Sequence, residues 1–485
     1  MKIGQTSLVV FVSKLIGSAL GFLATLYFAR VLGAEVIGIY AVILSTVAWL
    51  QTGGKMGISK ATNKRISEGT ERGSYLTAGY TLLLIFAVGA SVIVLLFQSH
   101  FEVYIDDFAG YSAVSVVWFI VIILISKLTF LYLTEVLKGQ HLVYIAGILK
   151  PAKTGLLSVF QIALVIAGFS LVGMLVGYVA GVVLIIVLGM TFVTIRPELP
   201  ERRHFRSLFE YAKFSWMGGL KSRALNDVDI VILNALVSTG LVGVYAVAWS
   251  LSKFLDLFSS SIGETVFPEI STISSRDGSE GTISIVEDAT AYAGLITIPG
   301  LVGGTILSDR LLRIYSEEFV QGTEVLWLLI LSVLFFSYYR QFLNALNGLD
   351  RPDMAFRANL AFITSNIVLN VVLIWQLGWV GAAIASVLSV LLGLVVSYVY
   401  LSRIITFRLP LGEIGRQVVA ALTMGGVVLT GRTVIESSTI IQHNVVIVLG
   451  LVGLGAFVYI VVLLAISSQF RLTIRRNLPF DVPHL

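Results

Sequence analysis

The feature that most constrains the fold of this chain is a series of long apolar stretches that recurs along almost its whole length. The stretches follow one another at intervals of about 25–35 residues, and each can cross the ~30 Å hydrocarbon core of a membrane as an α-helix. Only 13% of the residues are charged, which is about half the share of a typical soluble domain. The sequence therefore predicts an all-α polytopic membrane protein with about fourteen transmembrane helices and no sizeable soluble domain.

The limits of the spans follow from the apolar stretches to within a few residues. The seventh stretch differs in composition, because it carries Lys213, Lys221, Arg223, Asp227 and Asp229. Charged side chains are costly in hydrocarbon, so this helix is not expected to face lipid along its whole length. We place the fourteen spans at residues 7–29, 37–54, 76–97, 113–137, 143–167, 171–195, 207–237, 241–267, 290–308, 325–346, 358–376, 381–401, 418–431 (extended at one or both ends) and 445–466.

Basic residues are divided unequally between the two sets of connecting loops. One set and the two tails hold 20 Lys and Arg residues, whereas the other set is acidic and holds only Arg30, Arg310, Arg313 and Arg432. Because cytoplasmic loops carry the excess of basic residues, both termini are predicted to be cytoplasmic in a multi-pass protein of the cell membrane. This topology also accounts for the net charge of +5, and no nucleic-acid partner is expected.

The chain resembles itself at an offset of 205 residues, because residues 36–42 (VIGIYAV) recur as residues 241–247 (LVGVYAV). Six spans separate the two copies, so both have the same orientation. The repeat predicts two parallel six-helix lobes related by an axis along the membrane normal. We assign residues 1–203 to an N-terminal lobe, 204–403 to a C-terminal lobe, and 404–485 to two additional transmembrane helices with a basic cytoplasmic tail. The alternative is that a short apolar pattern recurs by chance.

Nine further basic residues fall inside the predicted spans, where each should cost several kcal/mol unless it is paired, hydrated or able to snorkel to the surface. In the second lobe, carboxylates stand one helical turn away from such residues, as Asp227 does from Arg223 and Asp256 from Lys253. Asp227, Asp229, Lys253 and Asp256 are candidates for gating or ion coupling. Structural ion pairs between helices are an equally good interpretation.

The first lobe offers almost no such compensation. Lys14, Lys127, Lys150 and Lys153 lie at depth, and Glu135 is the only acidic residue in the first six predicted spans. Unpaired cations predict a hydrated, electropositive cavity that attracts an anion, and a phosphate suits lysine as a point charge. We therefore predict that these four lysines contact a substrate phosphate, and that Arg223 and Arg340 hold the same group from the second lobe. Snorkelling is the alternative, and it fits Lys14 best.

Several other classes of protein are excluded by what the sequence lacks. There is no cysteine and no phosphate-binding Gly-x-x-x-x-Gly-Lys-Ser/Thr loop, and the five histidines form no metal-binding or catalytic pattern. We therefore expect no cofactor, no metal site and no enzymatic activity.

Four segments resemble the polysaccharide-transporter, or Wzx-like, flippases. They are residues 29–40 (ARVLGAEVIGIY), 56–59 (MGIS), 243–246 (GVYA) leading to 267–270 (FPEI), and 370–374 (NVVLI) followed by 377–385 (LGWVGAAIA). Any one alone is a weak match, but together they extend over most of the chain. The opening residues 2–7 and the absence of cysteine are most similar to haloarchaeal members.

The resemblance implies the fold of the multidrug/oligosaccharidyl-lipid/polysaccharide exporter superfamily. It also implies a flippase that moves a polyprenyl- or dolichyl-phosphate-linked sugar or oligosaccharide from the cytoplasmic to the external leaflet by alternating access. Such a protein would serve cell-surface polysaccharide synthesis or protein glycosylation, beside glycosyltransferases of the same pathway, and we expect it to be a monomer. Drug exporters of the superfamily use a carboxylate in the first span, whereas this chain has Lys14 and no acid there.

Two other functions stay open at this point. A cation-coupled exporter of a soluble solute or drug would use Asp227 and Asp229 as its ion site. A membrane-embedded glycosyltransferase or ligase would need a metal-binding acidic motif, for which only the acids between Glu102 and Asp107 are candidates.

Overall fold

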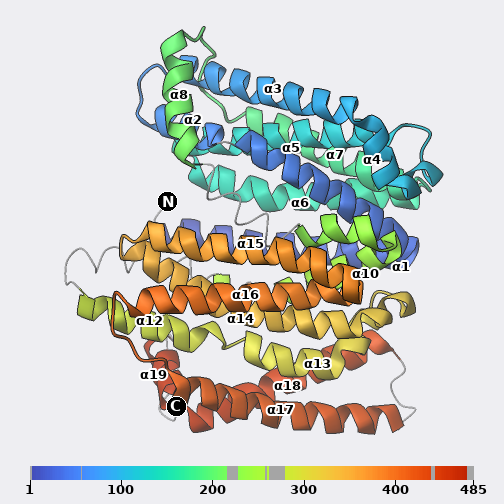
Figure 1. Cartoon of the computed structure of the whole chain (residues 1–485), viewed down its shortest axis with the longest axis vertical. Helices are drawn as coiled ribbons and strands as arrows, with labels where there is room; N and C mark the ends of the chain where they lie inside the picture. The colour runs from blue at the N-terminus through green and yellow to red at the C-terminus, as the bar shows by residue number, and fades with distance from the viewer. Residues whose placement is uncertain are drawn as a thin grey trace. The chain divides into compact units, whose positions relative to one another are not determined.

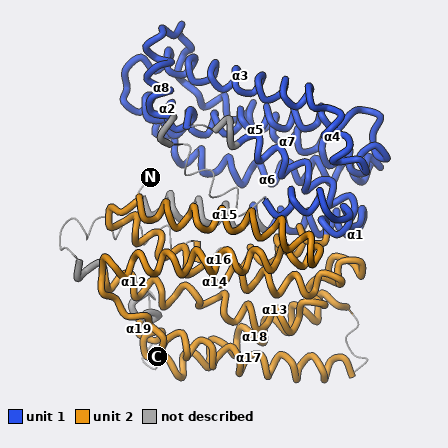
Figure 2. Tube along the Cα trace, viewed as in Figure 1, with its two compact units in different colours: residues 1–243 blue, residues 244–485 orange. Residues whose placement is uncertain are grey.

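The computed structural model describes residues 3–55, 57–215, 228–256, 259–260, 279–437 and 443–477. Before residue 17 it describes the backbone alone. The described residues form α-helices and two 3-10 helices, with no strand among them (Figure 1). The helices fall into two compact units, Met1–Gly243 and Val244–Leu485 (Figure 2). The all-α class predicted from the apolar stretches is confirmed.

The first unit is a bundle of long helices with shorter helices at its ends. α6 and α7 pack along each other, and α1 lies against α5 and α6. The helices are α1 (Ile3–Lys55), α2 (Ile58–Ser67), α3 (Arg72–Leu96), α4 (Gln98–Tyr104), η1 (Asp106–Gly110), α5 (Val116–Gly139), α6 (Val143–Ile166), α7 (Ser170–Met190), α8 (Arg202–Ser215) and the start of α10 (Thr239–Phe254).

The second unit continues with helices that pack against their neighbours in the chain, as α15 does against α16 and α16 against α14. Its helices after α10 are α12 (Ser279–Ala293), α13 (Thr297–Arg313), η2 (Glu317–Gly322), α14 (Thr323–Gly348), α15 (Pro352–Leu377), α16 (Trp379–Ser402), α17 (Leu411–Ser437), α18 (Asn444–Ile466) and α19 (Ser468–Asn477).

α3 shows why these helices belong in a membrane. It exposes Ile85, Val88 and Val92 at 63%, 59% and 47%, at helical spacing along one face, while Leu83 and Ala87 are buried on another. Soluble monomers rarely expose an apolar strip of this length, and lipid is the solvent that suits it. Eleven helical stretches of the described residues are long and apolar enough to span a membrane.

Most predicted spans coincide with described helices, although the ninth, 290–308, begins in α12 and continues through residues 294–296 into α13. The first two lie in α1, which is interrupted at Gly33, where φ is 80° and ψ is 178°. This backbone conformation favours glycine, and it separates α1 into two consecutive spans. α1 therefore counts once among the eleven stretches although it holds two predicted spans. The predicted count of fourteen is approximate for that reason, and because part of the chain lies outside the description.

The predicted seventh span, 207–237, starts differently in the structure. Its first residues belong to α8, an amphipathic helix that packs on α2 and α3 and runs across the ends of the long helices of its unit (Figure 1). Leu208 and Ala212 are buried, whereas Arg202 and Arg206 are exposed, so a polar face excludes this helix from the hydrocarbon core. Residues 216–227, the centre of that predicted span, lie outside the described residues.

The internal repeat reappears as a reciprocal contact within the first unit. A Cβ built on Gly38 of α1 would overlap the carbonyl oxygen of Thr239, and one built on Gly243 of α10 would overlap the carbonyl oxygen of Ala34. Both pairs are related by the same offset of 205 residues. The two small-xxx-small segments therefore cross with their backbones in contact. The predicted lobe boundary at residue 203 precedes the boundary of the compact units, and the division into six plus six helices stays a prediction.

α17 and α18, which lie beyond the repeat, pack against α13 in the second unit. Met424, Val428 and Leu451 contribute to an apolar cluster there with Ile298 and Leu307. An ionic network closes one end of the same three helices. In it Arg432 donates to both carboxylate oxygens of Asp309 at 2.9 Å and to Glu436 at 2.8 Å, and Arg310 donates to Glu436 and to Asn444.

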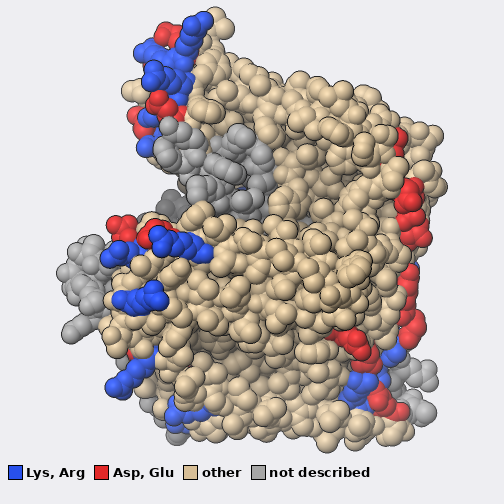
Figure 3. Space-filling model, viewed as in Figure 1, with Lys and Arg blue, Asp and Glu red and all other residues tan. Residues whose placement is uncertain are grey.

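Charged residues are sorted between the two ends of the helices. In the first unit, Lys and Arg gather over α2 and α8, whereas the opposite end near α4 shows Asp and Glu (Figure 3). In the second unit, acidic and basic residues lie together at the end where the ionic network joins α13 and α17 (Figure 3).

Candidate functional site

The candidate site in the first unit is built where α1 crosses α6. A Cβ on Gly17 would stand 2.8 Å from the Cβ of Pro151, so the two helices touch at the proline that interrupts α6. Lys150 precedes that proline and Lys153 follows it. Lys14 is placed on α1 one turn before Gly17, about 4.5 Å along the axis, and its side chain lies outside the description. The crossing therefore brings the backbone positions of three predicted lysines together.

Lys127 and Lys153 both point at aromatic rings inside the same bundle. The Nζ of Lys153 on α6 lies 4.8 Å from the centroid of the Phe130 ring on α5. The Nζ of Lys127, on α5, lies 5.7 Å from the centroid of the Tyr178 ring on α7. A cation over a ring face gains about 0.5–2 kcal/mol, which lowers the cost of its burial without cancelling its charge. Lys150 is exposed.

The single carboxylate of the first six predicted spans is already engaged. Glu135 is 9% exposed, accepts a hydrogen bond from Asn63 Nδ2 at 2.8 Å and forms an ion pair with Lys138 one turn away. Both partners lie towards the end of the unit that carries α2 and α8. That Lys127, Lys150 and Lys153 receive little acidic compensation stays a prediction.

A second polar group lies in the second unit, between the end of α10 and α14. Arg340 donates from Nη2 to Asp256 Oδ2 at 2.6 Å and stacks on Phe336, with its guanidinium carbon 4.7 Å from the ring centroid. Lys253 lies 4.8 Å from the ring centroid of Trp249. The carboxylate of Asp256 therefore reaches a partner on another helix, in addition to the helical neighbour Lys253 that the spacing predicts.

The Asp256–Arg340 pair keeps unused hydrogen-bonding capacity. Asp256 Oδ1 and Arg340 Nη1 are both buried and have no hydrogen-bond partner among the described residues. The Nη1 donor suits an anionic group and the Oδ1 acceptor suits a hydrogen-bond donor or a cation, and the role predicted for Arg340 stays a prediction. Arg223 and Asp227 lie outside the described residues. Asp229 is described and is 6% exposed, and its gating or coupling role stays a prediction.

Spacing alone identifies two of the four aromatic partners of these cations. Trp249 and Phe336 stand four residues before Lys253 and Arg340, a helical spacing visible in the sequence. The partners of Lys127 and Lys153 lie on other helices, and nothing in the sequence marks them. The described residues contain no group of three His, Cys, Asp or Glu side chains arranged to hold a metal ion.

Comparisons with known proteins show which family the chain resembles over its length. The profile of a protein family described as polysaccharide biosynthesis protein matches residues 3–274. The probable flippase AglR of Haloferax volcanii is 30% identical over 476 residues, which cover 97% of this chain and 97% of AglR. The probable low-salt glycan biosynthesis flippase Agl15 of the same organism is 28% identical over 461 residues, covering 93% of this chain and 94% of Agl15.

Among solved structures, the lipid II flippase MurJ in an inward closed conformation is similar to this chain with a TM-score of 0.76. The match covers 96% of this chain and 100% of that one, at 16% sequence identity. At this identity the likeness concerns the fold alone, and it confirms the fold expected from the sequence.

Proposed function

The chain belongs to the polysaccharide biosynthesis protein family, and from that membership we propose that it is a flippase for a lipid-linked saccharide. It moves a polyprenyl- or dolichyl-phosphate-linked sugar or oligosaccharide from the cytoplasmic to the external leaflet by alternating access. Two full-length relatives are themselves named as probable flippases, one of them in glycan biosynthesis. Both support a role in the synthesis of a cell-surface polysaccharide or glycoprotein.

One observation carries the substrate class. Lys127 and Lys153 meet aromatic rings inside a bundle whose only predicted intramembrane acid, Glu135, is paired with Lys138. Such a site disfavours a cationic drug and favours an anion. A phosphate on a polyprenyl carrier meets this condition, because its tail stays in the bilayer while the phosphate and the sugar follow the polar path. Arg340 then contacts the same phosphate when the cavity opens to the other side.

The test is a flipping assay in proteoliposomes with a fluorescent polyprenyl-phosphate-linked saccharide. We expect Lys150→Ala/Lys153→Ala to lower the protein-dependent rate at least about tenfold, because charged hydrogen bonds to the phosphate are lost. Lys150→Arg/Lys153→Arg should retain part of the rate. The control is Lys60→Ala, which removes an exposed lysine of α2. A double alanine variant that flips at the wild-type rate would refute the phosphate site.

The alternative, a cation-coupled exporter of a soluble solute, draws on the burial of Asp229 and Asp256. A carboxylate at these positions also suits a flippase driven by an ion gradient. The two are distinguished by supplying a sodium or proton gradient to proteoliposomes that contain either the lipid-linked saccharide or a soluble solute, and measuring which of them moves.

The proposal includes the location of the protein and its orientation in the membrane. The sorting of basic loops supports a cell-membrane protein with both termini in the cytoplasm, and α2 and α8 then lie at the cytoplasmic surface. Glycosyltransferases of the same pathway are the partners expected on that side. We expect the protein to act as a monomer and without enzymatic activity of its own.

A further inference from the structure

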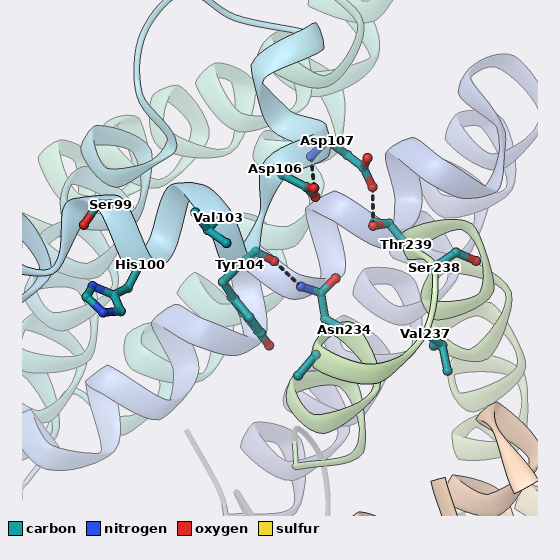
Figure 4. A pocket seen from close by; sticks show the side chains of 11 residues that line it. Ser99, His100, Val103, Tyr104, Asp106, Asp107, Asn234, Val237, Ser238 and Thr239 are labelled. Atoms are coloured by element: carbon teal, nitrogen blue, oxygen red, sulfur yellow. Dashed lines mark hydrogen bonds between the residues drawn. The ribbon is translucent and has the colours of Figure 1, made fainter. Parts of the chain in front are cut away.

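A pocket of about 740 Å³ opens at the end of the first unit opposite α2 and α8 (Figure 4). One wall is α4 with the start of η1, and the other is formed by residues 234–239, which lead into α10. Its volume falls within the ~300–1,000 Å³ range of small-molecule sites. The candidate phosphate site involves none of the residues that line this pocket, so it is a separate feature of the unit.

The two walls of the pocket are tied together by hydrogen bonds. Tyr104 donates from its hydroxyl to the carbonyl oxygen of Val231 at 2.6 Å, and Asn234 Nδ2 donates to the carbonyl oxygen of Tyr104 at 2.6 Å. Thr239 donates to Asp107 (Figure 4). Burial raises the pKa of Tyr104 above its ordinary value, so its hydroxyl keeps the proton that it donates.

The second wall is also fixed from behind. Thr239 touches Gly38 of α1 through its carbonyl oxygen, in the reciprocal crossing with Gly243. The wall cannot withdraw from α1 without separating these backbones. The pocket is therefore preformed, which lowers the entropic cost of binding a ligand.

The lining selects for a neutral, hydroxyl-rich ligand. It presents the carboxylates of Asp106 and Asp107, the imidazole of His100 and the hydroxyl of Ser99, and no lysine or arginine. Two carboxylates and no cation repel a phosphate. Carboxylate and hydroxyl oxygens accept and share hydrogen bonds with sugar hydroxyls. Val103 and Ala235 add exposed apolar surface for the C–H faces of a sugar ring.

We propose that this pocket binds the saccharide portion of the lipid-linked substrate at the external face. The inference rests on the proposed function, and it adds a second site of opposite charge. The lysines hold the phosphate at membrane depth, and the acidic pocket receives the neutral sugar after the cavity has opened outward. The carboxylates repel the phosphate, which favours its release into the external headgroup region.

The experiment measures binding of free sugars to the purified, detergent-solubilised protein by saturation-transfer NMR. The probes are glucose, mannose, galactose and N-acetylglucosamine. Binding of each sugar is also measured with Mg²⁺ or inorganic phosphate added as a competitor. Ala235→Trp fills the pocket from its exposed wall. Its matched control is Leu236→Trp, because the adjacent Leu236 is 46% exposed and does not line the pocket. Asp106→Asn is a milder variant. In the wild-type protein the backbone N–H of Asp107 donates to Asp106 Oδ1 at 2.9 Å, and the amide oxygen of asparagine can accept the same hydrogen bond.

We expect saturable transfer to at least one of these sugars, unaffected by phosphate. Ala235→Trp should abolish it, Asp106→Asn should weaken it about tenfold, and Leu236→Trp should leave it unchanged. The proposal is overturned if none of the sugars shows saturable binding, if both tryptophan variants bind like wild type, or if Mg²⁺ displaces the sugar, which would mark a cation site. Flipping by the wild-type protein in proteoliposomes is measured separately, so failure of sugar binding and failure of the flippase function are distinguishable.

Discussion

At the scale of single residues, the cations held at membrane depth share one kind of neighbour. Lys127, Lys153, Lys253 and Arg340 each lie over an aromatic ring. An aromatic face stabilises a cation but leaves its charge available to an anion, whereas a carboxylate would neutralise it. This suits the phosphate role proposed for Lys127 and Lys153, whereas Arg340 is also engaged by the carboxylate of Asp256.

The contact between Lys153 and Phe130 gives a prediction about stability. Phe130→Leu should lower the free energy of unfolding by more than the smaller side chain alone would, because about 0.5–2 kcal/mol of attraction between the Lys153 ammonium and the ring is lost as well. A double-mutant cycle with Lys153→Met isolates that part, measured by thermal unfolding in detergent. Phe130→Tyr keeps the ring and should retain the coupling to Lys153 in the same cycle, whatever a hydroxyl costs at a position that is 7% exposed. A coupling energy near zero would show that the ring does not stabilise the cation.

The Asp256–Arg340 pair gives a second prediction at this scale. Asp256→Asn or Arg340→Gln alone should destabilise the protein by about 1–3 kcal/mol, because each leaves a partly buried charge without its partner. The double variant should be less damaging than the sum of the two. Arg206→Gln breaks an exposed pair with Glu210, at 82% and 55% side-chain exposure, and should change stability by less than about 0.5 kcal/mol. Strictly additive losses would contradict a direct interaction.

At the scale of helices, the spans were predictable because hydrocarbon thickness sets their length. α3, α5, α6, α7 and α14 to α18 coincide with apolar stretches of the sequence. α8 is not predicted as a separate helix. Residues 207–215 lead directly into a charged but partly apolar stretch, so the prediction assigns both to one span. The alternation of Arg206, Leu208 and Ala212 around α8 is an amphipathic pattern of period 3.6, and a search for that period would have separated it from a span.

The crossing of α1 and α10 predicts different effects for three glycines. Gly38→Ala and Gly243→Ala should each cost about 1–3 kcal/mol of stability, because a Cβ at either position stands within 3.0 Å of the other's backbone nitrogen. Gly240→Ala, on the same helix, meets nothing within 4 Å and should be neutral or slightly stabilising. Thermal unfolding of the three purified variants checks this order. Equal losses at all three positions would refute the close crossing.

At the scale of the whole molecule, the sequence could predict the class and the topology, because both follow from summed properties of many residues. It could not predict which side chains meet. The partners Tyr178 and Phe130 of the two lysines lie on other helices, and only the folded bundle brings them together. The ionic network of α13 and α17 is another set of contacts that the sequence could not predict. Arg310 and Arg432, two of the four basic residues on the sparsely basic side, are joined there to Glu436.

The topology itself is testable because the chain contains no cysteine. Ala109→Cys in η1 and Ser402→Cys at the end of α16 place one thiol at each predicted surface, and both positions are exposed. In intact cells, a membrane-impermeant maleimide should label residue 109 and not residue 402, and residue 402 should react only after lysis. Labelling of residue 402 in intact cells would reverse the orientation.

The glycine crossing also bears on how such a chain could have originated. Ala34 and Gly38 meet Thr239 and Gly243 as if the same segment had been rotated onto itself, which is the geometry of an isologous dimer contact. Two copies of a half-length ancestor could have paired through this segment before a gene duplication joined them. In this chain the two glycines are the positions of the contact where a side chain is least tolerated, since a Cβ on either one overlaps the backbone of the other segment.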